Sequence, residues 1–163
     1  MIRVGIGYDS HRFAEGRPLV LGGCTVPSAR GLAGHSDADA LTHAVIDAVL
    51  GAAKAGNIGQ LFPDTDPAWK DADSIVLLRG ALERVRARGW TVAQVDATIV
   101  TEAPKLNPHV AAMERRLAEE LGVGVDCVSV KAKTNEGLGW IGRGEGLAVM
   151  AIATLAALGA EAR

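Results

Sequence analysis

The chain has 163 residues, a length typical of one domain of ~100–200 residues and sufficient to bury a hydrophobic core without disulfides or a structural metal. Lysine and arginine total 17 and aspartate and glutamate total 19, so the formal net charge is −2. This near-balance argues against a broad basic face for nucleic acid and against a polybasic membrane anchor. With 20 glycines and only 4% aromatic residues, we expect many loops and a core of small aliphatic side chains.

Cysteine usage and hydropathy indicate a cytoplasmic protein. Cys24 and Cys127 are far apart and form no CxxC pair, which is typical of a reducing compartment rather than of a disulfide framework or zinc ribbon. The first residues lack the apolar core of a signal peptide. The longest apolar run, Leu147 to Leu158, is shorter than the ~20 residues that span a bilayer, so we expect no membrane segment.

The first third of the chain predicts two extended segments and one helix. Residues 2–7 alternate with a period of two, as in a strand, and the apolar run 19–26 between two prolines predicts a further strand or hairpin arm. Ser36, with Asp39 three residues later, is a capping-box-like start for a helix. Residues 56–67 are rich in turn formers and predict a loop.

A helix and a strand follow. Asp73 or Ser74 is expected to cap the helix, apolar residues recur along it at helical spacing, and Gly89 ends it. Residues 91–102 have the β-branched alternation of a strand.

The last part of the chain predicts a helix, a strand and one ambiguous segment. Asn107-Pro108, a cap residue followed by proline, begins the helix, and Gly122 ends it. Residues 127–133 alternate as a strand, whereas Leu147–Leu158 fits a buried helix or a buried strand equally well. We therefore expect a single α/β domain over residues 1–163.

Three histidines lie near the first expected strand and helix. Asp9 and His11 are separated by one residue, so both side chains would point to the same face of a strand. His43 lies on the following helix, one turn after Asp39. Two imidazoles and one carboxylate suit a tetrahedral zinc site with an open fourth position, which a Lewis acid needs. The pattern is short, and unrelated histidines remain the alternative.

Several polar segments suit phosphate or nucleotide binding, although each is also an ordinary connection. His35-Ser36 precedes the expected helix start, where free N–H groups attract anions, and Ser36 could equally be a simple cap. Residues 62–66 form a rigid turn with paired acids, and residues 101–107 leave a strand where backbone groups could read a base edge. Residues 133–136 end a strand with Glu136, a suitable magnesium ligand beside a phosphate.

One literal match to a dinucleotide-binding motif is rejected. Residues 137–142 read GxGxxG, but that motif must open a βαβ unit with an acidic residue ~20 positions later on a second strand. The chain after residue 142 is too short to complete such a unit.

Taken together, these segments resemble the 2-C-methyl-D-erythritol 2,4-cyclodiphosphate synthase family over essentially the whole length. Several separate motifs in the right order are far more specific than any one of them. The resemblance is carried by residues 7–11 (GYDSH), 35–39 (HSDAD), 58–67 (IGQLFPDTDP), 103–105 (APK) and 142–146 (GRGEG).

The resemblance implies specific roles. Asp9, His11 and His43 match zinc ligands, Glu136 matches a ligand of a second ion, Mg²⁺ or Mn²⁺, and His35 and Thr134 match the catalytic pair that stabilises the transition state. The implied substrate-binding residues are Asp9, Ser10, His11, His35, Ser36, Asn57, Ile58, Gly59, Phe62, Pro63, Asp64, Thr65, Asp66, Thr101, Glu102, Ala103, Pro104, Lys105, Leu106, Asn107, Lys133, Thr134, Asn135, Glu136, Trp140 and Arg143.

Four of these positions depart from the family pattern. Asn57 stands where relatives often have Asp, so a charged contact to the sugar hydroxyls becomes neutral. Lys133 and Asn135 stand where we expect Thr, which changes the nucleotide pocket. Trp140 replaces Phe and keeps an aromatic face.

The implied reaction is an intramolecular phosphoryl transfer. The 2-phosphate of 4-diphosphocytidyl-2-C-methyl-D-erythritol 2-phosphate attacks the β-phosphate, CMP leaves and a cyclic diphosphate forms. The family is also homotrimeric, with active sites between subunits, which favours a strand over residues 147–158 in a mixed sheet that has helices on one face and packs around the three-fold axis. The alternatives are a zinc-dependent phosphohydrolase and a non-catalytic trimeric nucleotide-binding module.

Overall fold

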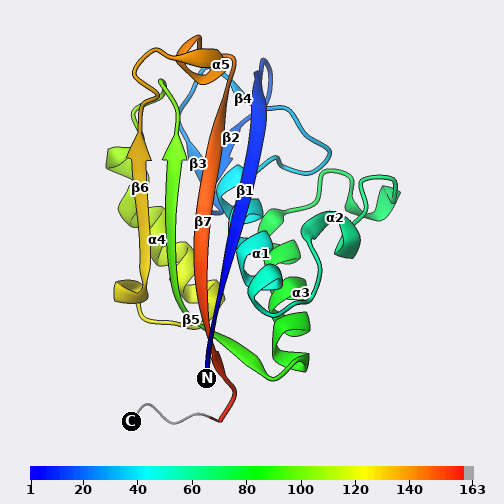
Figure 1. Ribbon diagram of the computed structural model, residues 1–163. Coiled ribbons are helices and arrows are strands. Elements are labelled where there is room, and N and C mark those ends of the chain that lie inside the picture. The colour runs from blue at the N-terminus through cyan, green and yellow to red at the C-terminus, as the bar shows by residue number, and fades with distance from the viewer. Residues whose placement is uncertain (160–163) are drawn as a thin grey trace.

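The computed structural model describes residues 1–159 and is built on a five-stranded mixed sheet (Figure 1). The strand order is β4-β1-β7-β5-β6; β7 pairs antiparallel with β1 and β5, and β5 pairs parallel with β6. A separate two-stranded hairpin, β2-β3, lies outside this sheet. The strands are β1 (Ile2–Ala14), β2 (Leu19–Leu21), β3 (Cys24–Val26), β4 (Gly31–Leu32), β5 (Trp90–Val100), β6 (Val128–Lys133) and β7 (Gly146–Ala157).

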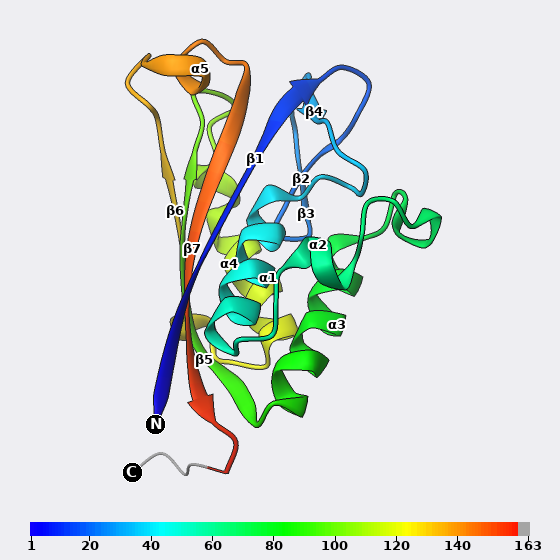
Figure 2. The same cartoon turned by 45° about the vertical axis from the view of Figure 1, so that its right-hand side comes forward.

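The three long helices cover one face of the sheet, as Figure 2 shows from the side. This arrangement confirms the expected α/β class with a mixed sheet and helices on one face. The long helices are α1 (Ala40–Ala52), α3 (Ser74–Ala87) and α4 (Asn107–Leu121). Short helical turns, which the sequence patterns did not predict, are α2 (Ile58–Leu61), η1 (Pro67–Trp69), η2 (Val125–Cys127) and α5 (Gly139–Gly142).

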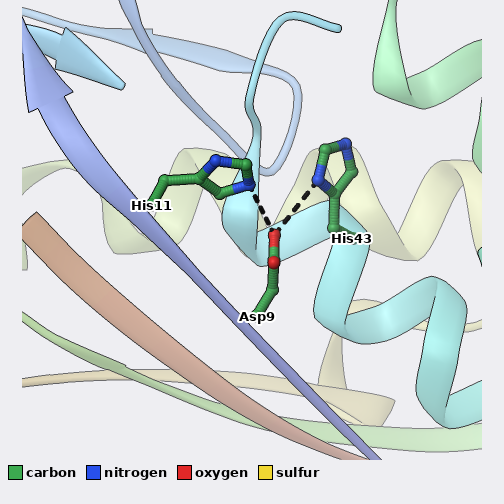
Figure 3. Close-up of side chains that lie close together, drawn as sticks. All are labelled: Asp9, His11 and His43. Atoms are coloured by element: carbon green, nitrogen blue, oxygen red, sulfur yellow. Dashed lines mark hydrogen bonds and ion pairs between the residues drawn. The ribbon is translucent and has the colours of Figure 1, made fainter. Parts of the chain in front are cut away.

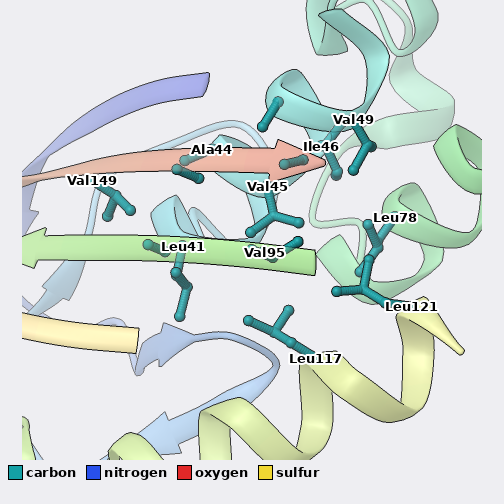
Figure 4. Packing of buried hydrophobic residues seen from close by; sticks show 14 of the residues in the cluster. Leu41, Ala44, Val45, Ile46, Val49, Leu78, Val95, Leu117, Leu121 and Val149 are labelled. Carbon is teal, nitrogen blue, oxygen red and sulfur yellow. The ribbon is translucent and has the colours of Figure 1, made fainter. Parts of the chain in front are cut away.

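Aliphatic side chains of moderate size fill the space between the helices and the sheet (Figure 4). Leu41 and Val45 of α1 lie between Val95 and Val149 of the sheet and Leu117 of α4, and all five are completely buried. Burial of such side chains stabilises the fold by roughly 1.5–3 kcal/mol each. The aromatic-poor composition is therefore compatible with a continuous core.

The opposite face of the sheet is apolar and open. Ile6 and Tyr8 of β1 pair with Ile152 and Met150 of β7, and these four side chains are 47–69% exposed. Among residues 1–159, no helix covers this face (Figure 2). A contiguous apolar surface of this kind is typical of a protein–protein interface.

The start of α1 corrects the expectation that Ser36 opens this helix. The N-cap is Asp39, whose carboxylate accepts a hydrogen bond from the N–H of Thr42, and the helix begins at Ala40. Ala38 has φ +58°, in the left-handed region, so residues 36–39 cannot continue a right-handed helix.

Two other boundaries also differ from the sequence expectation. Asn107 is already the first residue of α4, because Leu106 is the N-cap and makes no side-chain capping bond. The first strand extends beyond residue 7 to Ala14, since pairing with β7 continues to Arg12.

The ambiguous last segment is the strand β7, as the family resemblance favoured, and it lies between β1 and β5. Asp73 caps α3, as expected, by accepting from the N–H of Ile75. Within residues 1–159, no helix has both the length and the apolar character needed to cross a membrane.

Candidate metal centre and flanking cavities

Asp9, His11 and His43 converge where β1 passes the start of α1 (Figure 3). Asp9 Oδ2 lies 2.9 Å from His11 Nε2 and 3.1 Å from His43 Nδ1. One ligand atom from each residue lies within 4.8 Å of the other two. Asp9 and His11 are two positions apart on one strand face, and α1 brings the third ligand to that face.

The Asp9 carboxylate and the His11 imidazole shift each other's pKa toward the charged forms. Burial alone would raise the pKa of Asp9, but the hydrogen bonds and positive charge of His11 and His43 outweigh it and hold that pKa below its ordinary value. Burial alone would lower the pKa of His11, but the Asp9 carboxylate outweighs burial and raises it. The site therefore stabilises positive charge beside the Asp9 carboxylate.

The donor set fits a divalent cation such as zinc. Both imidazoles present one nitrogen to the cluster and use the other in a hydrogen bond: His11 Nδ1 lies 2.6 Å from the carbonyl of Ala33, and His43 Nε2 lies 2.7 Å from Ser74 Oγ. Outer bonds of this kind orient imidazole ligands in metal sites. Three protein ligands leave a fourth tetrahedral position open, as in catalytic zinc sites.

A cavity of about 340 Å³ opens beside the cluster. The expected site residues that line it come from β1, α1, the 35–36 segment and the loop around α2. Trp69 and Leu77 also line it and were not predicted; both belong to apolar patterns that read as core from sequence alone. The expected residues in this cavity are Asp9, His11, His35, Ser36, His43, Ile58, Gly59, Phe62 and Asp64.

The structure corrects the expectation that His35-Ser36 lies at a helix N-terminus, because α1 begins only at Ala40. Ser36 is nearly buried, and its Oγ accepts from the N–H of Ala38 and lies 3.2 Å from His43 Nε2. His35 is exposed. Arg17, which was not predicted as a site residue, donates to the carbonyls of Gly34 and Ser36. These hydrogen bonds fix the segment that carries His35 and Ser36.

The loop around α2 is held by its own capping groups. Asn57 accepts from the N–H of Gln60 at the start of α2, and Asp66 accepts from the N–H of Ala68. Asp47 accepts from the N–H of Ile58 at 2.7 Å, and burial raises the pKa of this carboxyl. Asp47 was not predicted, but its position four residues after His43 on α1 is a signal that it faces the site. The remaining expected residues, Pro63 and Thr65, lie in the exposed segment after α2.

A second cavity, of about 400 Å³, lies between the ends of β5 and β6 and the start of α4. Pro108 and Ala132 line it in addition to the expected residues, and a cis Ala103–Pro104 bond shapes its loop. The expected residues that line it are Thr101, Glu102, Pro104, Lys105, Leu106, Asn107, Lys133 and Thr134. Ala103 lines a smaller neighbouring cavity.

The loop that follows β6 is tied to this second cavity by Glu102. Its Oε1 accepts from the backbone N–H groups of Asn135 and Gly137, at 2.9 and 3.2 Å. Thr134 Oγ1 donates to Glu136 at 2.9 Å, and Glu136 has φ +51° and is exposed. Glu102 thus holds this loop through hydrogen bonds to its backbone N–H groups.

Three other expected residues lie beyond the two cavities. Ser10 and Trp140 line a further hollow of about 360 Å³ together with His11, and Arg143 donates to Glu145 at 2.7 Å. Within residues 1–159, the cavity at the metal cluster and the cavity at the β5–β6 ends share no lining residue. One chain therefore presents the two expected halves of the site separately.

Comparison with known proteins gives the family. The model of the YgbB family matches residues 2–156. The chain is 60% identical to 2-C-methyl-D-erythritol 2,4-cyclodiphosphate synthase of Gemmatimonas aurantiaca over 161 residues, which cover 99% of this chain and 97% of that protein.

Comparison with solved structures gives the same family. The chain matches a 2C-methyl-D-erythritol-2,4-cyclodiphosphate synthase in its CDP-bound form with a TM-score of 0.87 and 42% identity, covering 94% of this chain and 100% of that one. It also matches the bifunctional IspDF of Campylobacter jejuni with a TM-score of 0.93 and 42% identity, covering 97% of this chain and 43% of that longer chain. The chain belongs to the YgbB family, that of the 2-C-methyl-D-erythritol 2,4-cyclodiphosphate synthases.

Proposed function

We propose that this protein converts 4-diphosphocytidyl-2-C-methyl-D-erythritol 2-phosphate to 2-C-methyl-D-erythritol 2,4-cyclodiphosphate and CMP. An oxygen of the 2-phosphate forms a bond to the β-phosphorus, and the bond from the β-phosphorus to the bridging oxygen breaks. That oxygen leaves with its electron pair on the phosphate of CMP. The reaction needs no side-chain nucleophile, because both reacting groups belong to the substrate.

The observation that carries this proposal is the convergence of Asp9, His11 and His43 beside His35 and Ser36 in one cavity. The relatives support it, since they are cyclodiphosphate synthases and one of their structures contains CDP. When bound, a zinc ion on the three ligands and a Mg²⁺ or Mn²⁺ ion on Glu136 neutralise phosphate charge and polarise phosphoryl oxygens.

The chain's own groups hold the phosphates and the methylerythritol. Ser36 contributes a hydroxyl inside the cavity, and exposed His35 contributes an imidazole at its mouth for the charge that develops on the β-phosphate. The loop from Asn57 to Asp66 carries the sugar contacts. Asp47 supports that loop because its carboxylate accepts a hydrogen bond from the N–H of Ile58, which holds the loop close to α1.

The second cavity is the proposed nucleotide pocket. Residues 101–107 offer backbone groups to the cytosine, and Lys133, Thr134 and Asn135 surround the diphosphate. Thr134 donates to Glu136, which orients a carboxylate oxygen for the second cation. Glu102 contributes indirectly, because its two bonds to backbone N–H groups hold residues 135–137 in place.

The active unit in this proposal is a homotrimer with sites between subunits. The uncovered apolar face of β1 and β7 supplies the contact surface, and the separation of the two cavities within one chain supports a site shared by neighbours. Each subunit would give its metal half to one site and its nucleotide half to another. One domain per chain and a cytoplasmic location, which the two unpaired cysteines favour, complete the proposal.

Phosphorus NMR of the purified protein with substrate, Zn²⁺ and Mg²⁺ tests the reaction. The proposal expects equal amounts of CMP and a cyclic diphosphate. Linear phosphate products would identify a zinc-dependent phosphohydrolase instead. CDP binding without release of CMP would identify a nucleotide-binding module.

A further inference from the structure

The nitrogen of His43 that points away from the metal cluster faces buried hydroxyl groups. Nε2 lies 2.7 Å from Ser74 Oγ and 3.2 Å from Ser36 Oγ. Ser74, the first residue of α3, is completely buried, and His43 and Ser36 are 9% and 8% exposed. Water cannot easily replace a hydrogen bond lost in such surroundings, so this contact is costly to remove.

The hydroxyl of Ser74 has a second partner, the carboxylate of Asp37. Ser74 Oγ donates to Asp37 Oδ1, and the backbone N–H of Ser74 donates to Oδ2 at 2.9 Å. The N–H of Asp39 also donates to Oδ1, at 3.1 Å. Three donors from two segments therefore fix this carboxylate.

Counting hydrogens along this chain of contacts assigns the proton on His43. An ionised carboxylate only accepts, and a hydroxyl has one hydrogen. Ser74 gives that hydrogen to Asp37, so its oxygen must accept the Nε2–H of His43. Nδ1 lies 3.1 Å from the Asp9 carboxylate, which can only accept. A cation bound in the cluster replaces the hydrogen between these two atoms and takes the Nδ1 lone pair, while the proton on Nε2 stays in place.

We propose that Ser74 and Asp37 are positioning residues for the metal centre: they keep the proton of His43 on Nε2 and leave Nδ1 free to bind the cation. This inference rests on the metal-binding part of the proposed function and adds two residues outside the ligand set. Bonds to the outer nitrogen fix the orientation of an imidazole ligand and raise its basicity.

The same arrangement has a consequence for Ser36. Nε2 of His43 carries a proton in this arrangement, so this nitrogen can donate to Ser36 Oγ but cannot accept from it. Ser36 Oγ also receives the N–H of Ala38 at 3.2 Å. Its own hydrogen is then available to a phosphate oxygen in the cavity.

The affinity of the substrate-free protein for Zn²⁺, measured by competition with a chromogenic chelator, tests the proposal. Ser74→Ala removes the acceptor for Nε2–H, and we expect affinity to fall by about 10- to 100-fold, as is usual when such an outer partner is lost. The amide in Asp37→Asn has a single acceptor oxygen, so it cannot accept from both the hydroxyl and the N–H of Ser74. When that oxygen accepts the N–H, the NH2 group donates to Ser74 Oγ, and Ser74 offers its hydrogen to Nε2. This favours the proton on Nδ1 and should weaken Zn²⁺ binding to a similar extent.

Asp73→Asn is the matched control. It makes the same chemical change at the same end of α3, but Asp73 accepts from the backbone N–H of Ile75, and asparagine caps helices well. We expect this control to bind Zn²⁺ as the parent does. If folded Ser74→Ala and Asp37→Asn proteins bind Zn²⁺ as tightly as the control, the proposal is wrong.

A measurement on the unsubstituted protein decides the question even if the variants do not fold. In the Zn²⁺-loaded protein, ¹⁵N NMR should find the metal on Nδ1 of His43 and a slowly exchanging proton on Nε2. Metal on Nε2 would overturn the proposal. Neither measurement uses substrate, so a failed cyclisation in the phosphorus experiment would leave this result standing and contradict only the proposed reaction.

Discussion

Gly7 of β1 lies directly against the carbonyl oxygen of Ala44 in α1, and a Cβ built on Gly7 would be only 1.9 Å from that oxygen. Gly5, one step earlier on the same face, has a similar relationship with the carbonyl of Ala48, at 2.1 Å. The two glycines let the strand approach the helix closely. Asp9 follows on this strand face, and His43 precedes Ala44, so the approach sets the distance between two of the candidate metal ligands.

Gly7→Ala should therefore destabilise the protein and weaken metal binding together. The new methyl group would meet backbone, which cannot turn aside, so we expect a loss near or beyond the upper end of the ~1–3 kcal/mol typical of overpacking. Urea unfolding and Zn²⁺ titration measure the two effects. Gly51→Ala in α1 is the control, because its Cβ would meet only the carbonyl of Ile6 at 3.9 Å and should slightly stabilise the helix. Equal stability of the two variants would contradict this account of the β1–α1 contact.

His43→Ala should abolish zinc binding and reduce turnover by more than ~100-fold, since the charge stabilisation of a bound Lewis acid is several kcal/mol. The fold should persist, because the core around α1 consists of other side chains. Metal analysis, circular dichroism and phosphorus NMR check the three statements. His109→Ala on α4 removes a histidine away from the cluster and should retain zinc and activity. Full turnover in His43→Ala would show that the ligand assignment is wrong.

Local patterns in the sequence predicted most of the elements but not which face of a strand is covered. Ile2, Val4 and Ile6 alternate with smaller or polar residues, which indicates a strand. These apolar side chains point away from the helices, and Gly5 and Gly7 face α1 instead. The close packing of backbone against backbone decides the orientation, and a hydrophobicity pattern does not contain that information.

The start of α1 shows how distant contacts override a local signal. Ser36 and Asp39 are both acceptable caps by type. Asp39 also accepts from the N–H groups of Gly22 and Gly23, at 2.8 and 2.7 Å, in the turn of the β2–β3 hairpin. These bonds hold the carboxylate at the position from which it caps Thr42, and no spacing rule within residues 36–39 predicts them.

The candidate metal ligands could be proposed from the sequence because two of them share a strand and the third follows on the next helix. The outer partner of His43 could not, since Ser74 is 31 residues further along the chain and is itself an ordinary helix-start residue. The residues of the proposed nucleotide pocket could be named only through the family resemblance. Its residues are short polar connections that look like any loop until β5, β6 and α4 bring them together.

Glu120 predicts a dependence of stability on pH. It accepts two hydrogen bonds from Arg79, at 2.7 and 2.8 Å, across the gap between α4 and α3. These bonds, opposed in part by burial, lower the pKa of Glu120 in the folded protein. The unfolded chain therefore binds more protons in this range, and the stabilisation is present above about pH 4.3, the ordinary glutamate pKa, and is lost as pH falls through the lower folded pKa.

Unfolding free energies of the parent and Glu120→Gln, measured by urea denaturation from pH 3 to pH 7, check this. The difference between the two proteins should be largest near neutral pH and shrink toward pH 3. Removing Arg79 as well, in a double-mutant cycle, should add little, because its partner is already gone. A difference that stays constant over the whole range would contradict the assigned shift.

Glu136→Gln should affect the binding of the second cation without affecting the binding of zinc. The amide keeps the size of the side chain but is a poor ligand for Mg²⁺, which prefers carboxylate oxygens. We expect turnover to fall by more than ~10-fold and to require more Mg²⁺, while zinc content stays at the parent level. Glu119→Gln, an exposed position on α4, controls for the loss of one negative charge. If Glu136→Gln shows the parent's Mg²⁺ dependence, the second cation does not bind at this residue.

Mixing two variants of strongly reduced turnover tests whether sites are shared between subunits. His43→Ala lacks the metal half and Glu136→Gln lacks the cation ligand in the nucleotide half. If each site combines one half from each of two neighbours, subunits exchanged between the variants form some sites in which both halves are intact. We expect the mixture, after subunit exchange in mild denaturant and refolding, to regain a substantial fraction of the parent's turnover, with a trimer mass by light scattering. Each variant treated alone is the control. A site contained within one chain would give no recovery at any mixing ratio, because every chain in the mixture carries a defect.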